Sequence, residues 1–386
     1  MIEQFVFDMP TRVLFGAGQL KNLHKEQLPG KKALIVISHG GSMKRHGQLA
    51  AVEAELDKAG VEHVLYEGIR PNPTNTSVDE AAKMANDEGC DFVVALGGGS
   101  TMDASKAIAL VATNEGSCWD YSPSSTGGQK TPTEKPLPLI CITTSAGTGS
   151  EVDMWSVITN DQTKEKTGYA SMFPTMAVVD SDLMMSVPAN FTAYQGMDAF
   201  FHAAESVINV NEHVVGEMFA LKAIELIAKY LPRAVADGSD KEARNNMAIA
   251  NTLAGYYMLC TSEHTMEHAL GSAHPKLVHG AGLIMISHEY FNFFAERKAC
   301  EEQMVKMAKA MGVADATSGK DFVAALDKLI ADVNCSDLKM SDNGITREEL
   351  PGVVDVYHKV WGGNNDADPV KLSDEDVLGM FQRSYK

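Results

Sequence analysis

Short apolar runs alternate with amphipathic helical stretches through the first half of the chain, and this alternation constrains the fold more than any other feature. Because most of these runs are apolar at nearly every residue, they predict strands of a parallel sheet that is buried on both faces. The runs are Lys32–Ile37, Glu62–Tyr66, Asp91–Leu96, Pro138–Thr143 and Met176–Asp180. Leu49–Ala59 and Val78–Glu88 have helical spacing between them. Gln4–Phe7 and Thr11–Phe15 are expected to form a small hairpin or edge strands.

The strand pattern ends near Phe191, and the rest of the chain has the apolar spacing of helices. The predicted helices are Phe191–Asn209, Glu217–Tyr230, Ala243–Cys260, Gly282–Ala295, Ala299–Met311 and Lys320–Val333. A turn-forming Val187-Pro188-Ala189-Asn190 separates the two patterns. Since 386 residues exceed the usual size of one domain, we expect an α/β domain over residues 1–188 and an all-helical domain over residues 189–386.

Charge and composition narrow the class of partner. The chain has 33 basic and 51 acidic side chains, a net charge of −18, which argues against binding nucleic acid or an anionic membrane. No apolar run approaches the roughly 18 residues of a membrane span, and the first residues lack the pattern of a signal peptide. Six cysteines without a Cys-x-x-Cys pair are expected to be buried thiols in a reducing cytoplasm.

Two glycine-rich turns follow predicted strands. Gly97-Gly98-Gly99-Ser100 opens a helical stretch, so its backbone N–H groups could hold a phosphate, although it lacks the G-x-G-x-x-G spacing and a tight turn without a ligand is the alternative. The second turn, His39-Gly40-Gly41-Ser42, lies where an NAD site usually has a carboxylate for the ribose. Between Ile37 and Gln48 there is no acidic residue, but there are two basic ones, Lys44 and Arg45. The turn could therefore accommodate a 2′-phosphate on the ribose.

A third loop, Thr143–Ser150, is dense in hydroxyl groups and glycine and follows another predicted strand. Ligands gather at the carboxyl ends of parallel strands, so this loop is a second candidate for nucleotide binding. A hydroxyl-rich loop that caps a helix is the alternative.

The helical half contains five residues with the spacing of metal ligands. Asp198 and His202 are four residues apart, as are His264 and His268, and His279 follows. Residues at this spacing share one helix face, and such groups within apolar helices need partners that a divalent ion can supply. Three imidazoles and one carboxylate suit Fe(II) or Zn(II); with no thiolate in the set, softer metals are less expected.

Together these motifs resemble those of the iron-containing alcohol dehydrogenases over essentially the whole chain. The matching segments are TRVLFGAG (11–18), RPNPT (70–74), ALGGGSTMDASKA (95–107), TTSAGTGSEV (143–152), GMDAFFHAAE (196–205), and SEHTMEHAL with HPKLVHGAGL (262–283). HGGSMKRHG (39–47) looks most like the butanol-dehydrogenase branch. The resemblance implies the two-domain fold shared with dehydroquinate synthases: a Rossmann-like parallel-sheet domain, an all-α metal-binding domain, and an active site in the cleft between them.

The resemblance also implies roles for individual residues. Asp198, His202, His264 and His279 match the metal ligands. His268 matches a histidine near the nicotinamide, and we expect it to be catalytic. His274 could compete with His279 for the third histidine position; we favour His279 because Gly-Ala-Gly follows it. The residues that match or border the cofactor site are Gly40, Gly41, Ser42, Asn72, Gly97, Gly98, Gly99, Ser100, Asp103, Thr143, Thr144, Thr148 and Lys166.

The activity implied by this resemblance is reversible hydride transfer between NADP(H) or NAD(H) and a primary alcohol or its aldehyde, with Fe²⁺ or alternatively Zn²⁺, in a cytoplasmic homodimer. Three rivals remain: a glycerol-type polyol dehydrogenase, a dehydroquinate synthase-like lyase, and an inactive metal-binding scaffold. The lyase would need basic residues for a phosphorylated acid substrate. Apart from histidine, Lys276 is the single basic residue in Phe191–Val210 and Thr261–Ile286.

Overall fold

The computed structural model describes residues 4–360, 363 and 365–386. The chain divides into two compact units. The α/β unit is Asp8–Ser186, and the helical unit is Val187–Lys386 together with the N-terminal segment up to Phe7. Within the described residues no helix has both the length and the apolarity required to cross a membrane.

The α/β unit is built on one six-stranded parallel sheet with the strand order β1-β8-β5-β4-β2-β3. Its strands are β1 (Arg12–Phe15), β2 (Lys32–Ser38), β3 (Glu62–Ile69), β4 (Phe92–Gly97), β5 (Leu139–Thr143) and β8 (Met176–Val179). The predicted parallel α/β fold is therefore confirmed.

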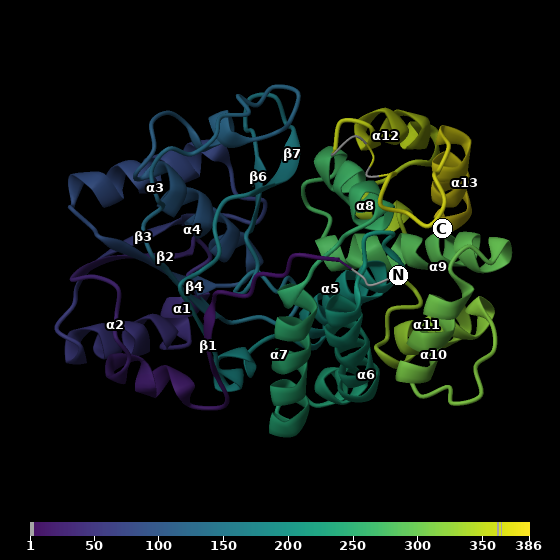
Figure 1. The fold of residues 1–386 in the computed structure, drawn as a ribbon, viewed down its shortest axis with the longest axis horizontal. Helices are drawn as coiled ribbons and strands as arrows, with labels where there is room; N and C mark the ends of the chain where they lie inside the picture. The colour runs from purple at the N-terminus through teal and green to yellow at the C-terminus, as the bar shows by residue number, and fades with distance from the viewer. Residues whose placement is uncertain (1–3, 361–362, 364) are drawn as a thin grey trace. The chain divides into compact units, whose positions relative to one another are not determined.

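The two faces of this sheet are covered by different helices (Figure 1). Side chains alternate across a strand, so Leu34 and Val36 face the core formed with α3 (Asn75–Asp87) and α4 (Gly99–Val111). Ala33, Ile35 and Ile37 face the opposite core, which contains residues of η1 (Gln19–Lys25) and α2 (Gln48–Lys58). Burial on both sides explains why the strands read as continuous apolar runs.

The direction of chain progression reverses between β2 and β4. After β2 the chain adds β3 at one edge, then returns to place β4 on the other side of β2. In open α/β sheets ligands bind outside the carboxyl ends of the strands at such a reversal point. Both glycine-rich turns, 39–42 and 97–100, begin there, the first leading into the short helix α1 (Ser42–Arg45).

A separate antiparallel hairpin, β6 (Trp155–Thr159) and β7 (Lys166–Ala170), was not expected from the sequence. Its strands are short, and β7 contains Lys166 and Gly168, which weaken the strand pattern. Asp103 of α4 holds the hairpin, because its Oδ2 accepts a hydrogen bond from Val157 N at 3.0 Å.

The expectation for the N-terminal residues is half right. Arg12–Phe15 is an edge strand, paired in parallel with β8. Gln4–Phe7 is not a strand, and that part of the prediction is wrong. The aromatic side chains of the segment pack on the helical unit instead: Phe5 stacks on His213 with ring centroids 4.0 Å apart, and Phe7 contacts other rings there.

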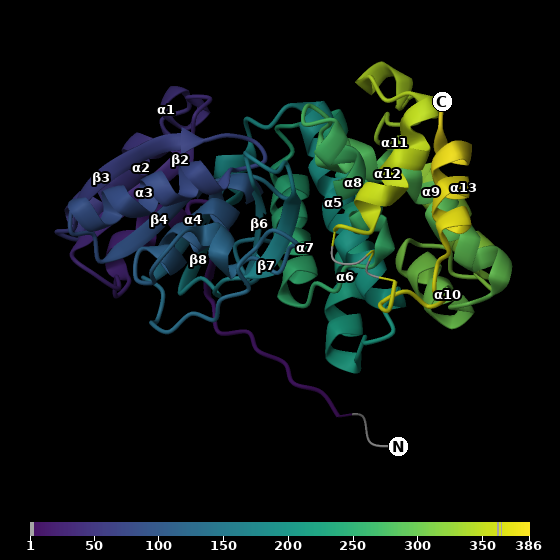
Figure 2. The same ribbon diagram turned by 90° about the horizontal axis from the view of Figure 1, so that it is seen from above.

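The helical unit surrounds α5 (Ala189–Ile208), which packs against α6, α7 and α9 (Figure 2). Between Gly196 and Ile208 every residue of α5 is buried, as expected for a central helix. The other helices are α6 (Val214–Ala236), α7 (Lys241–Tyr256), α8 (Ser262–Ala273), α9 (His279–Arg297), α10 (Glu301–Ala310), α11 (Gly319–Asp332), α12 (Leu350–Tyr357) and α13 (Asp374–Ser384). The prediction of an all-α second part is confirmed, although α12 and α13 were not foreseen. Short 3-10 turns are η2 (Cys118–Tyr121), η3 (Ser181–Met184), η4 (Ser341–Asn343) and η5 (Arg347–Glu349).

Candidate metal and nucleotide sites

Three helices bring the four proposed metal ligands to one point. Asp198 and His202 lie one turn apart on α5, His264 lies in the first turn of α8, and His279 is the first residue of α9. The Oδ1 atom of Asp198 is almost equally far from one ring nitrogen of each of the three histidines. It lies 3.7 Å from Nε2 of His202, 3.5 Å from Nε2 of His264 and 3.6 Å from Nε2 of His279.

Two glycines allow α9 to approach this point closely. A Cβ atom at Gly280 would clash with the carbonyl oxygen of Tyr194 on α5. A Cβ atom at Gly282 would lie 2.7 Å from Cγ of Glu267 on α8. Larger residues at these positions would push α9, and with it His279, away from the other ligands.

The donor set fits a divalent metal ion. Asp198 Oδ1 and His264 Nε2 are buried and have no hydrogen-bond partner among the described residues, which is costly unless another group satisfies them. Ligand atoms about 2.1 Å from a tetrahedral ion lie about 3.4 Å from one another, and the three separations from Asp198 Oδ1 are close to this value. Burial raises the pKa of Asp198, but the protonated forms of His202, His264 and His279 beside it hold that pKa below its usual range; a bound cation would take the place of those protons.

Carboxylates behind the imidazoles hold two of them in position. Nδ1 of His264 is hydrogen-bonded to Glu205, and Nδ1 of His279 is hydrogen-bonded to Glu267. Each carboxylate accepts a hydrogen bond from Nδ1–H of its histidine. The other ring nitrogen, Nε2, then carries no proton, faces Asp198 and is available as a ligand. Both glutamates are fully or almost fully buried. Their role was not predicted from the sequence, although Glu205 lies in GMDAFFHAAE and Glu267 in SEHTMEHAL, two of the motifs shared with the family.

A buried network holds Glu205 itself. Its Oε2 accepts hydrogen bonds from N and Oγ1 of Thr261, both at 2.7 Å. Tyr290 OH lies 2.7 Å from Thr261 Oγ1 and donates to Asp368 Oδ1 at 2.6 Å. Burial raises the pKa of Asp368 to about 7. Because these residues come from separate segments, neither motif nor spacing could have revealed the network.

Of the two remaining histidines, His268 lies beside the proposed ligand His279, whereas His274 is bound to a different carboxylate. His268 is buried, and its ring centroid lies 5.2 Å from that of His279. His274 lies at the end of α8, and its Nε2 atom is 2.7 Å from Oε1 of Glu349. His279 contacts Asp198 and His274 has a different carboxylate partner, which supports the choice of His279 as the ligand.

One cysteine departs from the expectation that no thiolate accompanies these residues. Cys260 lies in the connection between α7 and α8, and its Sγ atom is within 4.8 Å of ring nitrogens of His202 and His264. All six cysteines are free thiols, as expected from the sequence. Five of them are buried; Cys260 is partly exposed, so for this residue the expectation of burial is wrong.

In the α/β unit, the glycine turn after β4 packs against the hydroxyl-rich loop after β5. Gly98 is the residue before α4, so the first N–H groups of that helix are available to an anion. A Cβ atom at Gly98 would lie 2.9 Å from Ser145 Oγ, and one at Gly99 would clash with Thr148. Thr144 N donates to Gly97 O at 3.0 Å and joins the two loops directly.

The other proposed cofactor residues have varied surroundings. Thr143 is buried, and its hydroxyl donates to Ser145 O at 2.9 Å. Asp103 is engaged inside the unit, because it accepts hydrogen bonds from Ser150 Oγ at 2.5 Å and from Val157 N. Lys166 is 9% exposed on β7. Asn72 adopts a positive φ of 54° before α3.

The turn after β2 is open to solvent and lies beside the end of β3. Gly41 has a φ of 67°, a conformation that favours glycine, whereas a Cβ atom at Gly40 would meet nothing within 4 Å. Lys44 forms an ion pair with Glu67 of β3, and Arg45 donates to Gly40 O at 2.8 Å. The carboxylate of Glu67 was missed, because it reaches the turn from a neighbouring strand.

Comparison with known proteins agrees with this architecture. Residues 10–181 match the model of the iron-containing alcohol dehydrogenases, and residues 192–385 match that of the C-terminal part of the same family. The chain is 32% identical to a 1,3-propanediol dehydrogenase of Klebsiella pneumoniae, covering 99% of each chain. It is 30% identical to an NADPH-dependent butanol dehydrogenase of Clostridium saccharobutylicum, covering 98% of this chain and 97% of the other. An archaeal halo-thermophilic alcohol dehydrogenase from a Red Sea brine pool superposes with a TM-score of 0.93, at 36% identity and full coverage of both chains.

Fold and comparisons together define a nicotinamide-dependent oxidoreductase of alcohols and aldehydes. More particularly, the chain belongs to the iron-containing alcohol dehydrogenase family.

Proposed function

We propose that this enzyme reduces short, unbranched aldehydes to primary alcohols, and catalyses the reverse reaction, with iron held by Asp198, His202, His264 and His279. The observation that carries the proposal is the meeting of these four side chains from three helices, with Asp198 Oδ1 and His264 Nε2 buried and lacking hydrogen-bond partners among the described residues. Metal content after reconstitution with Fe²⁺, measured together with aldehyde reduction, tests it.

Iron bound there supplies a Lewis acid for the substrate oxygen, and the nicotinamide carries the hydride. The protein keeps the centre in place: Glu205 and Glu267 hold two imidazoles with Nε2 toward Asp198. We assign His268 as the group that exchanges the hydroxyl proton with solvent, because it is buried next to His279 and is not among the three histidines that contact Asp198.

The α/β unit holds the dinucleotide in this proposal. The N–H groups of Gly97–Ser100 bind the pyrophosphate, and the hydroxyls of Thr144 and Thr148 line the cofactor beside it. Gly40–Ser42 meet the adenosine ribose, and Lys166 lies close to the nicotinamide ribose. Asn72, Asp103 and Thr143 border the site; of these, Asp103 and Thr143 support its loops through the hydrogen bonds described above.

We further propose a homodimer that works in the reducing cytoplasm, with the domain boundary between residues 188 and 189. The division of compact units after Ser186 supports this boundary. Six reduced cysteines support the choice of compartment. Light scattering on the purified chain tests the dimer directly.

Among substrates, butanal is expected to be reduced with a higher kcat/KM than glyceraldehyde, by about tenfold to a hundredfold, because the ligand-bearing segments are apolar rather than basic and would disfavour additional hydroxyls. Steady-state rates on butanal, 3-hydroxypropanal and glyceraldehyde measure this. The 1,3-propanediol dehydrogenase relative makes a diol substrate the second candidate. A clear preference for 3-hydroxypropanal, or for glycerol over butanol in the oxidation direction, would assign the enzyme to the polyol branch.

The lyase alternative has little support in the helical unit. The metal-bearing segments carry a single lysine, Lys276, and its side chain is exposed on the surface. Recognition of a phosphorylated, carboxylated substrate would require cations facing the substrate.

For the cofactor, NADPH is expected to be used at least as well as NADH. The ribose-facing turn carries glycines instead of a carboxylate, and Lys44 and Arg45 can approach a 2′-phosphate. The opposing Lys44–Glu67 pair is about half exposed on both sides, so breaking it costs little. The NADPH-dependent relative is consistent with this expectation.

Gly40→Asp is expected to shift the kcat/KM ratio toward NADH by about tenfold, equivalent to about 1.4 kcal/mol, through repulsion of the 2′-phosphate. The open space around Gly40 admits the side chain without strain. Gly40→Asn is the matched control, because it adds the same bulk without charge and should leave the ratio nearly unchanged. A strong preference of the unmodified enzyme for NADH would contradict the cofactor assignment.

A further inference from the structure

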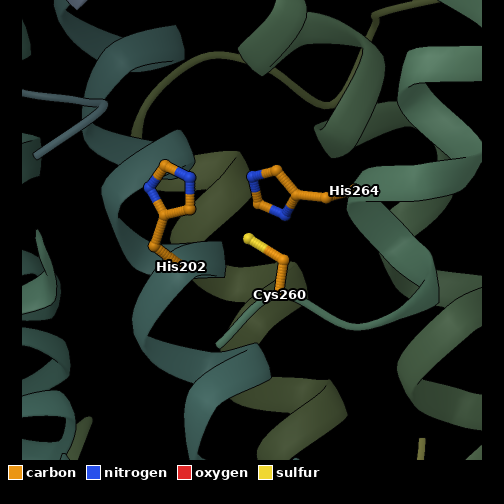
Figure 3. A group of neighbouring side chains, drawn as sticks. All are labelled: His202, Cys260 and His264. Carbon is orange, nitrogen blue, oxygen red and sulfur yellow. The ribbon is translucent and has the colours of Figure 1, made fainter. Parts of the chain in front are cut away.

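A sulfur atom that is not among the four proposed ligands lies beside the metal centre. Figure 3 shows the Cys260 side chain with its sulfur directed toward the imidazoles of His202 and His264. The Sγ atom and one ring nitrogen of each histidine all lie within 4.8 Å of one another. The two imidazoles are stacked, with centroids 4.5 Å apart and an angle of 19° between the ring planes.

This trio shares two members with the Asp198 group. His202 and His264 belong to both, and among the described residues no group of mutually close ligand atoms contains Cys260 together with Asp198 and His279. His264 Nε2 is buried and has no hydrogen-bond partner among the described residues. A thiol beside ring nitrogens of two imidazoles is the donor set that a nitrogen–sulfur metal site requires.

The distances are compatible with coordination after a small movement. Zinc bonds of about 2.3 Å to sulfur and about 2.0–2.1 Å to imidazole place these ligand atoms about 3.6 Å apart. Since the ligand atoms lie within 4.8 Å of one another, the side chains must close by at most about 1.5 Å. Cys260 lies in the connection between α7 and α8 rather than within a helix, so a movement of this size does not disturb helical hydrogen bonds.

We propose that Cys260 is a metal ligand in a second coordination mode of this centre, in which Zn²⁺ or Co²⁺ is bound by His202, His264 and the Cys260 sulfur. The inference rests on the proposed metal site, from which it takes two ligands. Fe²⁺ favours the set with the Asp198 carboxylate, whereas zinc gains more from a sulfur donor. Cys260 thus determines how strongly zinc competes with iron for the protein.

The test uses Co²⁺ as a spectroscopic probe of the metal-free, full-length protein. Coordination by a thiolate gives an intense near-ultraviolet sulfur-to-cobalt charge-transfer band, which nitrogen and oxygen ligands do not give. The band is expected in the wild-type protein and in Asp198→Asn, and is expected to be absent from Cys260→Ser and Cys260→Ala. Cys300→Ser, which changes another cysteine of the same unit, is the matched control and should retain the band.

Zinc affinity supplies an independent measurement. Competition with a chromophoric chelator should show binding of Zn²⁺ weakened by about tenfold or more in Cys260→Ser and unchanged in Cys300→Ser. Visible cobalt bands without the charge-transfer band in the wild-type protein would overturn this inference and leave the four-ligand centre standing. Absence of any bound cobalt would remove both the inference and the proposed metal site.

Discussion

His279→Ala is expected to abolish tight metal binding and turnover, whereas His274→Ala should leave the metal content near that of the wild-type protein. His279 presents Nε2 to Asp198 Oδ1 at 3.6 Å, while Glu267 holds its other nitrogen. Removing this imidazole takes away one of the four donors that meet at the centre. His274 is instead paired with Glu349.

The measurement is metal content per chain after reconstitution with Fe²⁺ and removal of excess ion, followed by the rate of aldehyde reduction. Circular dichroism of both variants controls for loss of fold. The reverse ranking, with metal lost in His274→Ala and retained in His279→Ala, would refute the ligand assignment.

Lys106→Met is expected to destabilise the α/β unit by about 3–5 kcal/mol, the cost of removing one partner from a buried ion pair. The Lys106 side chain is fully buried, and its Nζ donates to Asp153 Oδ1 at 2.6 Å, to Ser150 Oγ at 2.9 Å and to Trp155 O at 2.9 Å. Burial lowers the pKa of Lys106, but Asp153 and Asp103 outweigh it and keep the ammonium charged. Burial raises the pKa of Asp153 to about 6 even with the lysine present.

Urea-induced unfolding followed by circular dichroism gives this loss of stability. The control is Lys83→Met, which removes an exposed pair with Asp87 on α3 and should cost less than about 0.5 kcal/mol. Equal unfolding curves for the two variants would show that the buried charges are not held by Lys106.

Much of the fold could be predicted because burial leaves a direct trace in the sequence. The strand over Lys32–Ser38 is apolar at five consecutive buried positions, and the prediction differs from the structure by one residue. The hairpin Trp155–Ala170 has strands of five residues, partly polar, that pair with each other and not with the main sheet. Short polar strands resemble loops in a sequence, so pattern alone could not separate them.

The metal centre, like the fold, could be predicted only in part from the sequence. Ligand candidates on one helix are visible from i, i+4 spacing, as with Asp198 and His202. The pairing of Glu205 with His264 and of Glu267 with His279 is not visible in the sequence, because it depends on how α5, α8 and α9 pack against one another. The proximity of Cys260 to His202 was not predicted for the same reason: it is set by the path of a loop, for which the sequence offers no periodic signal.

The pairing of β1 with β8 has a consequence for the order of events during synthesis. β1 begins at Arg12, but its partner ends at Val179, so the ribosome must deliver almost the whole α/β unit before the first strand can join the sheet. Phe5 and Phe7 can make their contacts only later still, because they pack on His213, Phe219 and Tyr257 of the helical unit. β1 and the rings of Phe5 and Phe7 therefore find their native contacts only after much later parts of the chain have been made.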